Sequence, residues 1–224
     1  MKIALQAGTS SIIGFAVFLL MVFWPAGTFS YWRGWAFIAV FAAATLIPSV
    51  YLAATNPAAL KRRMQAGPAA ETRPLQKIII TFAFVSMGAM IMLSALDFRF
   101  GWSSVPAAVS VAGDVLVAVG LLIAMITTNQ NGYAAANVKV ESGQQVVSTG
   151  VYAVVRHPMY FGNVVMMIGV PLALGSYWGL LFVIPGLVVL ATRILDEEKV
   201  LTQQLAGYRD YAQRVHFRLV PYVW

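Results

Sequence analysis

Long stretches without a charged side chain dominate this sequence. Five of them cover residues 3–32, 34–60, 78–96, 115–138 and 157–192. A helix needs only about 20 apolar residues to cross the hydrocarbon of a membrane. Only 10% of the chain is charged and 60% is hydrophobic, whereas roughly a quarter of the residues in a soluble domain are charged. The chain is therefore predicted to be an all-α integral membrane protein.

The last of these stretches is too long for a single crossing. Its 36 residues (157 to 192) would form a helix of roughly 54 Å, against a hydrocarbon core of about 30 Å. Pro171, Gly175 and Ser176 interrupt it and predict a turn between two short helices. The chain is thus expected to have about six transmembrane helices, the last two forming a helical hairpin. Their predicted ranges are 4–24, 31–54, 75–96, 103–128, 158–174 and 177–195.

The basic residues predict how these helices are oriented. If the N-terminus is cytoplasmic, the only basic residues on the outer side are Arg33 and Arg99. Because cytoplasmic loops carry an excess of Lys and Arg, both termini are expected in the cytoplasm. The same asymmetry explains the formal net charge of +7. No basic soluble domain remains that would bind nucleic acid, so no nucleic-acid partner is expected.

Polar side chains gather in the last third of the chain. The loop 129–156 is rich in turn formers and hydrogen-bonding groups, among them Asn129, Gln144 and Gln145. The two segments with such residues, 129–156 and 196–224, lie on the same predicted side of the membrane. Any chemistry is therefore expected at the cytoplasmic face.

The start of the fifth predicted helix is a candidate anion site. Pro158 suits the first helical position, so His157 would cap the helix and Tyr160 would lie in its first turn. Free amides at a helix start attract anions. Arg156 either joins such a site or reaches lipid head groups, and the residues alone leave both readings open.

The end of the sixth predicted helix carries Arg193 and Glu197, four residues apart on one face. Such a pair is either an interfacial ion pair or part of a binding site. Because the hairpin returns the chain to its starting level, this pair is expected near His157 and Tyr160. The basic, amphipathic tail 207–221 either lies on the membrane surface or caps this pocket.

Other classes of function find little support. Asp114 is the one acid predicted deep within a span, so ion or proton transport would depend on it alone. The motifs of nucleotide-binding folds, metalloproteases and serine hydrolases are missing from the sequence. Two histidines without cysteine disfavour zinc, and no metal is expected.

Three groups of residues carry a resemblance to a known family. They are Ser-Thr-Gly-Val-Tyr at 148–152, Arg-His-Pro-Met-Tyr at 156–160, and Glu197 and Glu198 followed by Gly207, Tyr208 and Tyr211. With this spacing, residues 129–221 resemble the prokaryotic branch of the isoprenylcysteine carboxyl methyltransferase family, which is related to the phospholipid methyltransferases. Residues 1–128 match only as generic spans. The chain is thus predicted to divide into a four-helix transmembrane scaffold, 1–128, and a methyltransferase-like catalytic region, 129–224.

The resemblance implies an enzyme that binds S-adenosylmethionine at the cytoplasmic membrane face, while a lipophilic or lipid-modified substrate enters from the bilayer. It implies carboxyl O-methylation. N-methylation of a phospholipid or other lipid amine and a non-catalytic lipid-binding role are the alternatives. The expected location is the cytoplasmic membrane of a bacterium or archaeon, with membrane lipids as neighbours.

The same motifs assign site residues. Arg193 would face a substrate carboxylate and act in catalysis with Glu197, and Arg156 and Asn129 are further substrate-binding candidates. Glu141 departs from the family, which often has glutamine there. The residues expected to hold the cofactor are Gln144, Gln145, Val146, Val147, Tyr152, His157, Pro158, Met159, Tyr160 and Glu197.

Overall fold

The computed structural model describes residues 2–64, 67–134 and 140–224, with side chains described from residue 14 onward. All regular elements in these ranges are helical, which confirms the predicted all-α class. The long helices are α1 (Lys2–Ala26), α2 (Trp32–Thr55), α4 (Pro74–Phe100), α5 (Ala107–Gln130), α6 (Pro158–Ala173) and α7 (Val183–Gln204). The short ones are α3 (Pro57–Met64), α8 (Tyr208–Arg214) and the 3-10 helices η1 (Pro68–Ala70), η2 (Gly150–Ala153) and η3 (Trp178–Phe182). Residues 135–139 of the predicted polar loop lie outside the described ranges.

Apolar helices occupy all the positions predicted for spans. Four are long and apolar enough to cross a membrane: Trp32–Thr55, Pro74–Phe100, Ala107–Gln130 and Trp178–Gln204. Two shorter apolar segments, Gly14–Ala26 and Pro158–Ala173, fall at the first and fifth predicted spans. The count of six crossings stays a prediction, because the 16 residues of α6 extend only about 24 Å.

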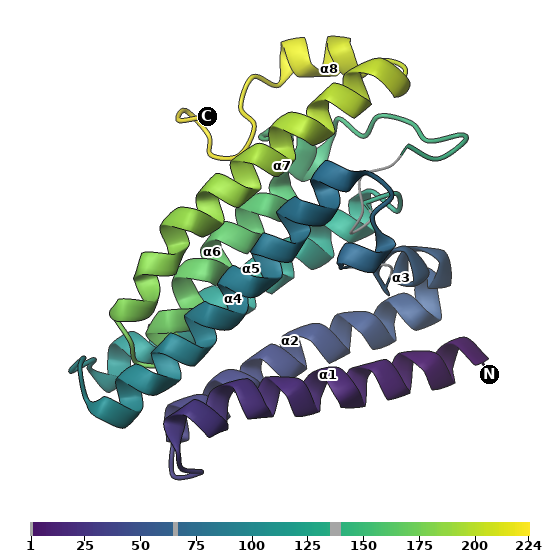
Figure 1. The fold of residues 1–224 in the computed structure, drawn as a ribbon. Coiled ribbons are helices and arrows are strands. Elements are labelled where there is room, and N and C mark those ends of the chain that lie inside the picture. Colours follow the sequence, from purple (N-terminus) through teal and green to yellow (C-terminus); the bar gives the residue numbers. More distant parts are fainter. Residues whose placement is uncertain (1, 65–66, 135–139) are drawn as a thin grey trace.

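The long helices alternate in direction, so α1 begins and α7 ends at the same end of the molecule (Figure 1). The short helices α3 and α8 lie at this end too. We call it the polar end, because it holds the loop that precedes α6 and the acidic end of α7. The candidate site is therefore built at one end of the helix bundle.

The opposite end is fixed by a buried aspartate that joins two turns. Asp97, near the end of α4, accepts hydrogen bonds from the hydroxyls of Ser103, at 2.6 Å, and Ser176, at 2.5 Å. Gly175 has a φ of +73°, a left-handed conformation that glycine adopts without strain. The predicted turn between the last two apolar helices is confirmed, because α6 ends at Ala173 and η3 begins at Trp178.

Helices α5 and α6 pack backbone against backbone. A Cβ atom added to Gly120 of α5 would lie 2.5 Å from the carbonyl oxygen of Gly162 of α6. About two helical turns away on both helices, a Cβ atom on Gly169 would lie 2.7 Å from the carbonyl oxygen of Gly113. Small residues allow membrane helices to approach this closely. The contact places the start of α6 beside the end of α5.

We expect Gly120→Ala to destabilise the protein. Alanine in a helix is normally favoured over glycine by about 1 kcal/mol, but the added methyl group would push two backbones apart at a cost of about 1–3 kcal/mol. The matched control is Gly14→Ala on α1, where no described residue outside the local helix backbone lies within 4 Å of the added Cβ. Thermal unfolding in detergent measures both variants. Equal midpoints for the two would contradict the close contact between α5 and α6.

Candidate active site

A pocket opens at the polar end, between the loop before α6, the start of α6, the end of α7 and the start of α8. It holds about 830 Å³ of space, including the part open to solvent. All ten residues predicted to hold the cofactor line it, together with Arg156. The remaining lining residues are Asn131, Tyr133, Ala134, Val200, Leu201, Leu205 and Tyr208.

Of these seven, sequence reasoning placed Tyr208 in a tail that could cap the pocket, and it assigned none of the other six to the site. Val200 and Leu201 follow Glu197 by three and four positions, so helical spacing alone would have placed them on the same face. Asn131 and Tyr133 follow α5, and only the packing of α5 against α6 brings them to the pocket. Asn129, a predicted substrate ligand, is exposed and does not line the pocket.

The start of α6 has the predicted arrangement. His157 precedes the helix and Pro158 is its first residue. The Tyr160 and Phe161 amides both donate to the His157 carbonyl at 3.1 Å. This leaves the Met159 amide as the donor that an anion at this helix start would meet, because proline has no N–H.

A cluster around Glu198 holds the C-terminal tail against the start of α6. The Glu198 carboxylate pairs with Arg156 at 3.2 Å, with His157 at 3.2 Å and with Arg218 at 2.9 Å. His157 and Glu197 line the same pocket, as expected, but the acid that contacts the His157 ring is Glu198. Successive residues of a helix point about 100° apart, so only one of two adjacent acids faces His157.

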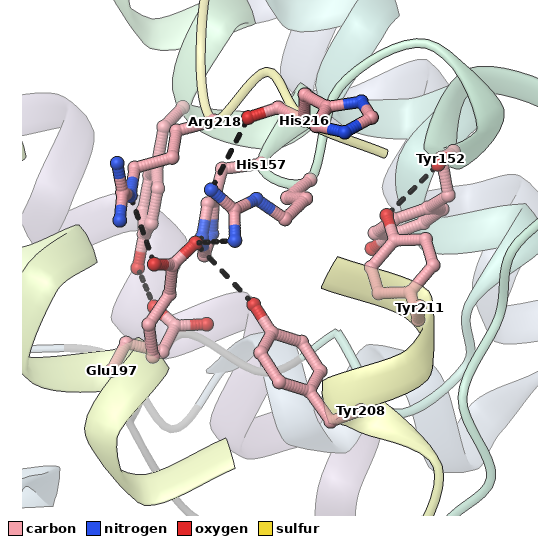
Figure 2. A network of polar contacts seen from close by, with 10 residues as sticks. Tyr152, His157, Glu197, Tyr208, Tyr211, His216 and Arg218 are labelled. Atoms are coloured by element: carbon pink, nitrogen blue, oxygen red, sulfur yellow. Dashed lines mark hydrogen bonds and ion pairs between the residues drawn. The ribbon is translucent and has the colours of Figure 1, made fainter. Parts of the chain in front are cut away.

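The tail caps the pocket, one of the two positions that the sequence left open for it. Tyr208 lines the pocket, and the Tyr211 hydroxyl donates to the Tyr152 carbonyl at 2.8 Å (Figure 2). Tyr208 and Tyr211 also pack with Val146 in one apolar cluster. Burial raises the pKa of the Tyr152 hydroxyl to about 12, although a hydrogen bond from Asn131 opposes the shift. The phenol is therefore neutral at physiological pH.

Arg193 lies behind the pocket wall. The Tyr160 hydroxyl donates to Glu197 at 2.6 Å and accepts a hydrogen bond from Arg193 Nε at 2.9 Å. Arg193 is only 4% exposed, and its other nitrogens bind the Gln76 side-chain oxygen at 2.8 Å and the Glu71 carboxylate at 2.9 Å. Arg193 and Glu197 thus flank Tyr160 as predicted, but only Glu197 and Tyr160 line the pocket. A carboxylate of the chain itself is already bound to Arg193.

Contacts cross the predicted boundary at residue 128. Arg73 Nη2 donates to Asp196 at 2.9 Å, and the Gln76 side-chain amide donates to the same carboxylate. Glu71 and Gln76 are both buried. The N-terminal helices therefore help to fix the end of α7, in addition to anchoring the bundle. Elsewhere at this end, Glu141 pairs with Arg62 at 3.0 Å.

Asp114, the acid singled out in the sequence, lies on α5 and is 8% exposed. Its Oδ1 atom is buried and has no hydrogen-bond partner among the described residues. It does not line the pocket at the polar end.

The chain is similar in sequence and in structure to known proteins. Residues 108–208 match the family model described as phospholipid methyltransferase. Over 88 residues, 37% of this chain, the sequence is 31% identical to the Delta(14)-sterol reductase of Mus musculus, and it spans 21% of that protein's length. A solved structure, that of the eukaryotic intramembrane Ras methyltransferase isoprenylcysteine carboxyl methyltransferase without a monobody, is 16% identical with a TM-score of 0.48. That alignment covers 98% of this chain and 87% of the other.

The family match runs from the start of α5 to the first residue of α8. It includes the loop before α6, Arg156, His157 and Glu197, which are the elements that form the pocket. It supports a membrane methyltransferase. The match agrees with the methyltransferase relationship found in the motifs: over α5 to α8, this integral membrane protein is similar to the phospholipid methyltransferase family.

Proposed function

We propose that this protein is an S-adenosylmethionine-dependent methyltransferase that acts at the cytoplasmic membrane face on a lipophilic substrate. One observation carries the proposal: the ten residues that the motifs assign to the cofactor, spread from 144 to 197, all line a single pocket. The match of residues 108–208 to a methyltransferase family model also supports it.

The pocket offers groups that suit the cofactor. Arg156 Nε is buried without a hydrogen-bond partner among the described residues, so it has a donor available for a carboxylate. The Glu197 carboxylate suits an ammonium or a ribose hydroxyl, and Val146 and Leu201 offer an apolar wall for a base. When bound, S-adenosylmethionine would supply a methyl group carried on a positively charged sulfur.

We propose a carboxylate as the methyl acceptor. A carboxylate is already an anion at neutral pH, so the protein need not remove a proton from it. The work of the side chains is then to position the acceptor and to exclude water, both of which increase the rate of a displacement. Tyr160 and Glu197 at the pocket wall are held in place by Arg193, which would serve this positioning.

The family match gives a reason to consider a second candidate, N-methylation of a lipid amine. An ammonium must lose a proton before it can accept a methyl group, and a nearby base would assist. Glu198 is paired with Arg156 and Arg218 and contacts His157, so it is a poor base. Glu197 lines the pocket and is the better candidate.

Calorimetric titration with S-adenosylmethionine tests the proposal itself. We expect saturable binding by the purified protein in detergent or nanodiscs. A protein that shows no heat of binding, although it is folded by its thermal transition, would contradict the proposal and favour a non-catalytic lipid-binding role.

The pH profile separates the two acceptors. For a carboxylate, kcat/KM is expected to be flat from about pH 6 to 9, because the acceptor's pKa is about 4. For an amine it should rise by roughly tenfold per pH unit until the base or the amine is deprotonated. The measurement is initial methyl transfer from radiolabelled cofactor to a membrane lipid extract, at constant ionic strength. A rising profile would contradict the carboxylate assignment.

A further inference from the structure

A second cavity lies between α2, α3 and α5, at the polar end. It holds about 640 Å³ of space, including the part open to its surroundings. Arg63 is the one charged residue among those that line it. The lining residues are Ala44, Thr45, Pro48, Ser49, Leu52, Leu60, Arg63, Met64, Leu121, Ala124, Met125 and Thr128. The cavity therefore combines one cation with a largely apolar wall.

Arg63 is a partly buried cation that contacts two uncharged side chains. Its Nη1 atom donates to the Thr128 hydroxyl at 2.9 Å and contacts Met159 Sδ at 3.6 Å. Among residues 14–64, 67–134 and 140–224, no carboxylate lies within 4.0 Å of it. Burial without a counter-charge lowers the pKa of Arg63. Such a cation is costly to bury and would be stabilised by an anion.

Arg63 differs from the neighbouring arginines in having no carboxylate partner among the described residues. The other partly buried or buried arginines at the polar end pair with carboxylates: Arg62 with Glu141, Arg73 with Asp196, Arg193 with Glu71, and Arg156 and Arg218 with Glu198. Arg209 and Arg214 are exposed on α8, where water solvates them. An anion that enters this end of the molecule would thus find Arg63 available.

The rest of the wall suits a hydrocarbon chain. The Thr45 and Ser49 hydroxyls each donate to a carbonyl of their own helix at 2.7 Å, and the Thr128 hydroxyl does so at 2.8 Å. Their donors are therefore already used. The remaining lining residues, such as Leu52 and Leu121, are apolar. The cavity matches a molecule with an anionic head and one apolar chain.

The cavity adjoins the candidate active site through one residue. Met159 lines the pocket and contacts the Arg63 guanidinium. An anionic group on Arg63 would thus lie beside the pocket wall. Arg193, by comparison, already binds Glu71 and does not line the pocket.

We propose that this cavity binds the methyl acceptor, a single-chain amphiphile whose carboxylate pairs with Arg63 and whose chain lies between α2 and α5. The inference rests on the proposed function, which requires a lipophilic carboxylate beside the cofactor pocket. It assigns the acceptor anion to Arg63, on a helix of the N-terminal region, in place of Arg193.

Direct binding of palmitate to the purified protein in detergent tests the inference, with palmitamide as the uncharged probe of equal chain length. Arg63→Gln is expected to weaken palmitate binding by roughly 10- to 100-fold, the effect of losing a charge-assisted hydrogen bond, and to leave palmitamide binding unchanged. Lys61→Gln removes an exposed charge from the same helix and is the matched control, expected to bind palmitate as the wild type does. Ala124→Leu, which narrows the cavity, should weaken both probes.

The outcomes separate this inference from the proposed function. The thermal transition shows whether each variant is folded, and Arg63→Gln is expected to bind S-adenosylmethionine with the wild-type affinity. If that variant binds the cofactor and also binds palmitate like the wild type, the inference is overturned while the methyltransferase proposal stands. If palmitate binding depends on Arg63 but the wild type does not bind the cofactor, the cavity stands and the proposed function fails. Lysophosphatidate binding more tightly than palmitate through Arg63 would overturn the carboxylate assignment.

Discussion

Replacement of Arg193 by alanine is expected to abolish turnover and to lower the free energy of unfolding by about 3–5 kcal/mol. Glu71 is 3% exposed and pairs with Arg193 at 2.9 Å, so the change leaves a buried carboxylate without its cation. The Gln76 side-chain oxygen and the Tyr160 hydroxyl would each lose a donor as well. Chemical or thermal unfolding in detergent measures the stability, and product formation measures the turnover.

A double variant separates the structural role of Arg193 from a role at the substrate. In Arg193→Gln with Glu71→Gln, both side chains are neutral and no buried charge is left unpaired, so most of the lost stability should return. If Arg193 only positions Tyr160 and Glu197, turnover should recover in part together with stability. If Arg193 binds a substrate carboxylate, the double variant will be stable and inactive. Wild-type stability in Arg193→Ala would contradict the buried pairing with Glu71.

Glu197→Gln is expected to weaken S-adenosylmethionine binding by about 10- to 100-fold, because one or more charge-assisted hydrogen bonds to the cofactor would be lost. The shape of the side chain is nearly unchanged, and its oxygen can still accept from the Tyr160 hydroxyl. Stability should therefore change little. Calorimetric titration gives the dissociation constant.

Asp210→Asn provides the control for Glu197→Gln. Asp210 is exposed on α8, so the variant makes the same change of charge outside the pocket. We expect it to bind the cofactor like the wild type. If Glu197→Gln and Asp210→Asn have the same affinity, the assignment of Glu197 to the cofactor site is wrong.

The sequence by itself determined the architecture, because lipid leaves few options. Backbone groups in a membrane must bond within their own segment, so long charge-free stretches become helices. Local signals then placed their ends: Pro158 has no amide to donate and begins α6, and Gly175 makes the left-handed turn after it. The residues that the family resemblance assigns to the cofactor line one pocket for a related reason. Most of them lie within 144–160, and the hairpin had to bring Glu197 back to the same level.

The tertiary structure alone decided which side chains meet. It pairs His157 with Glu198 instead of Glu197, encloses Arg193 with Glu71 and Gln76, and leaves Arg63 in a cavity without a carboxylate partner among the described residues. These contacts depend on the rotation of each helix about its axis and on the approach of helices far apart in sequence. A helix that is apolar all round has no hydrophobic stripe from which that rotation can be read. That rotation is set by the backbone contact between α5 and α6 and by the packing of α4 against α7. The rotation in turn decides which side chains form the site.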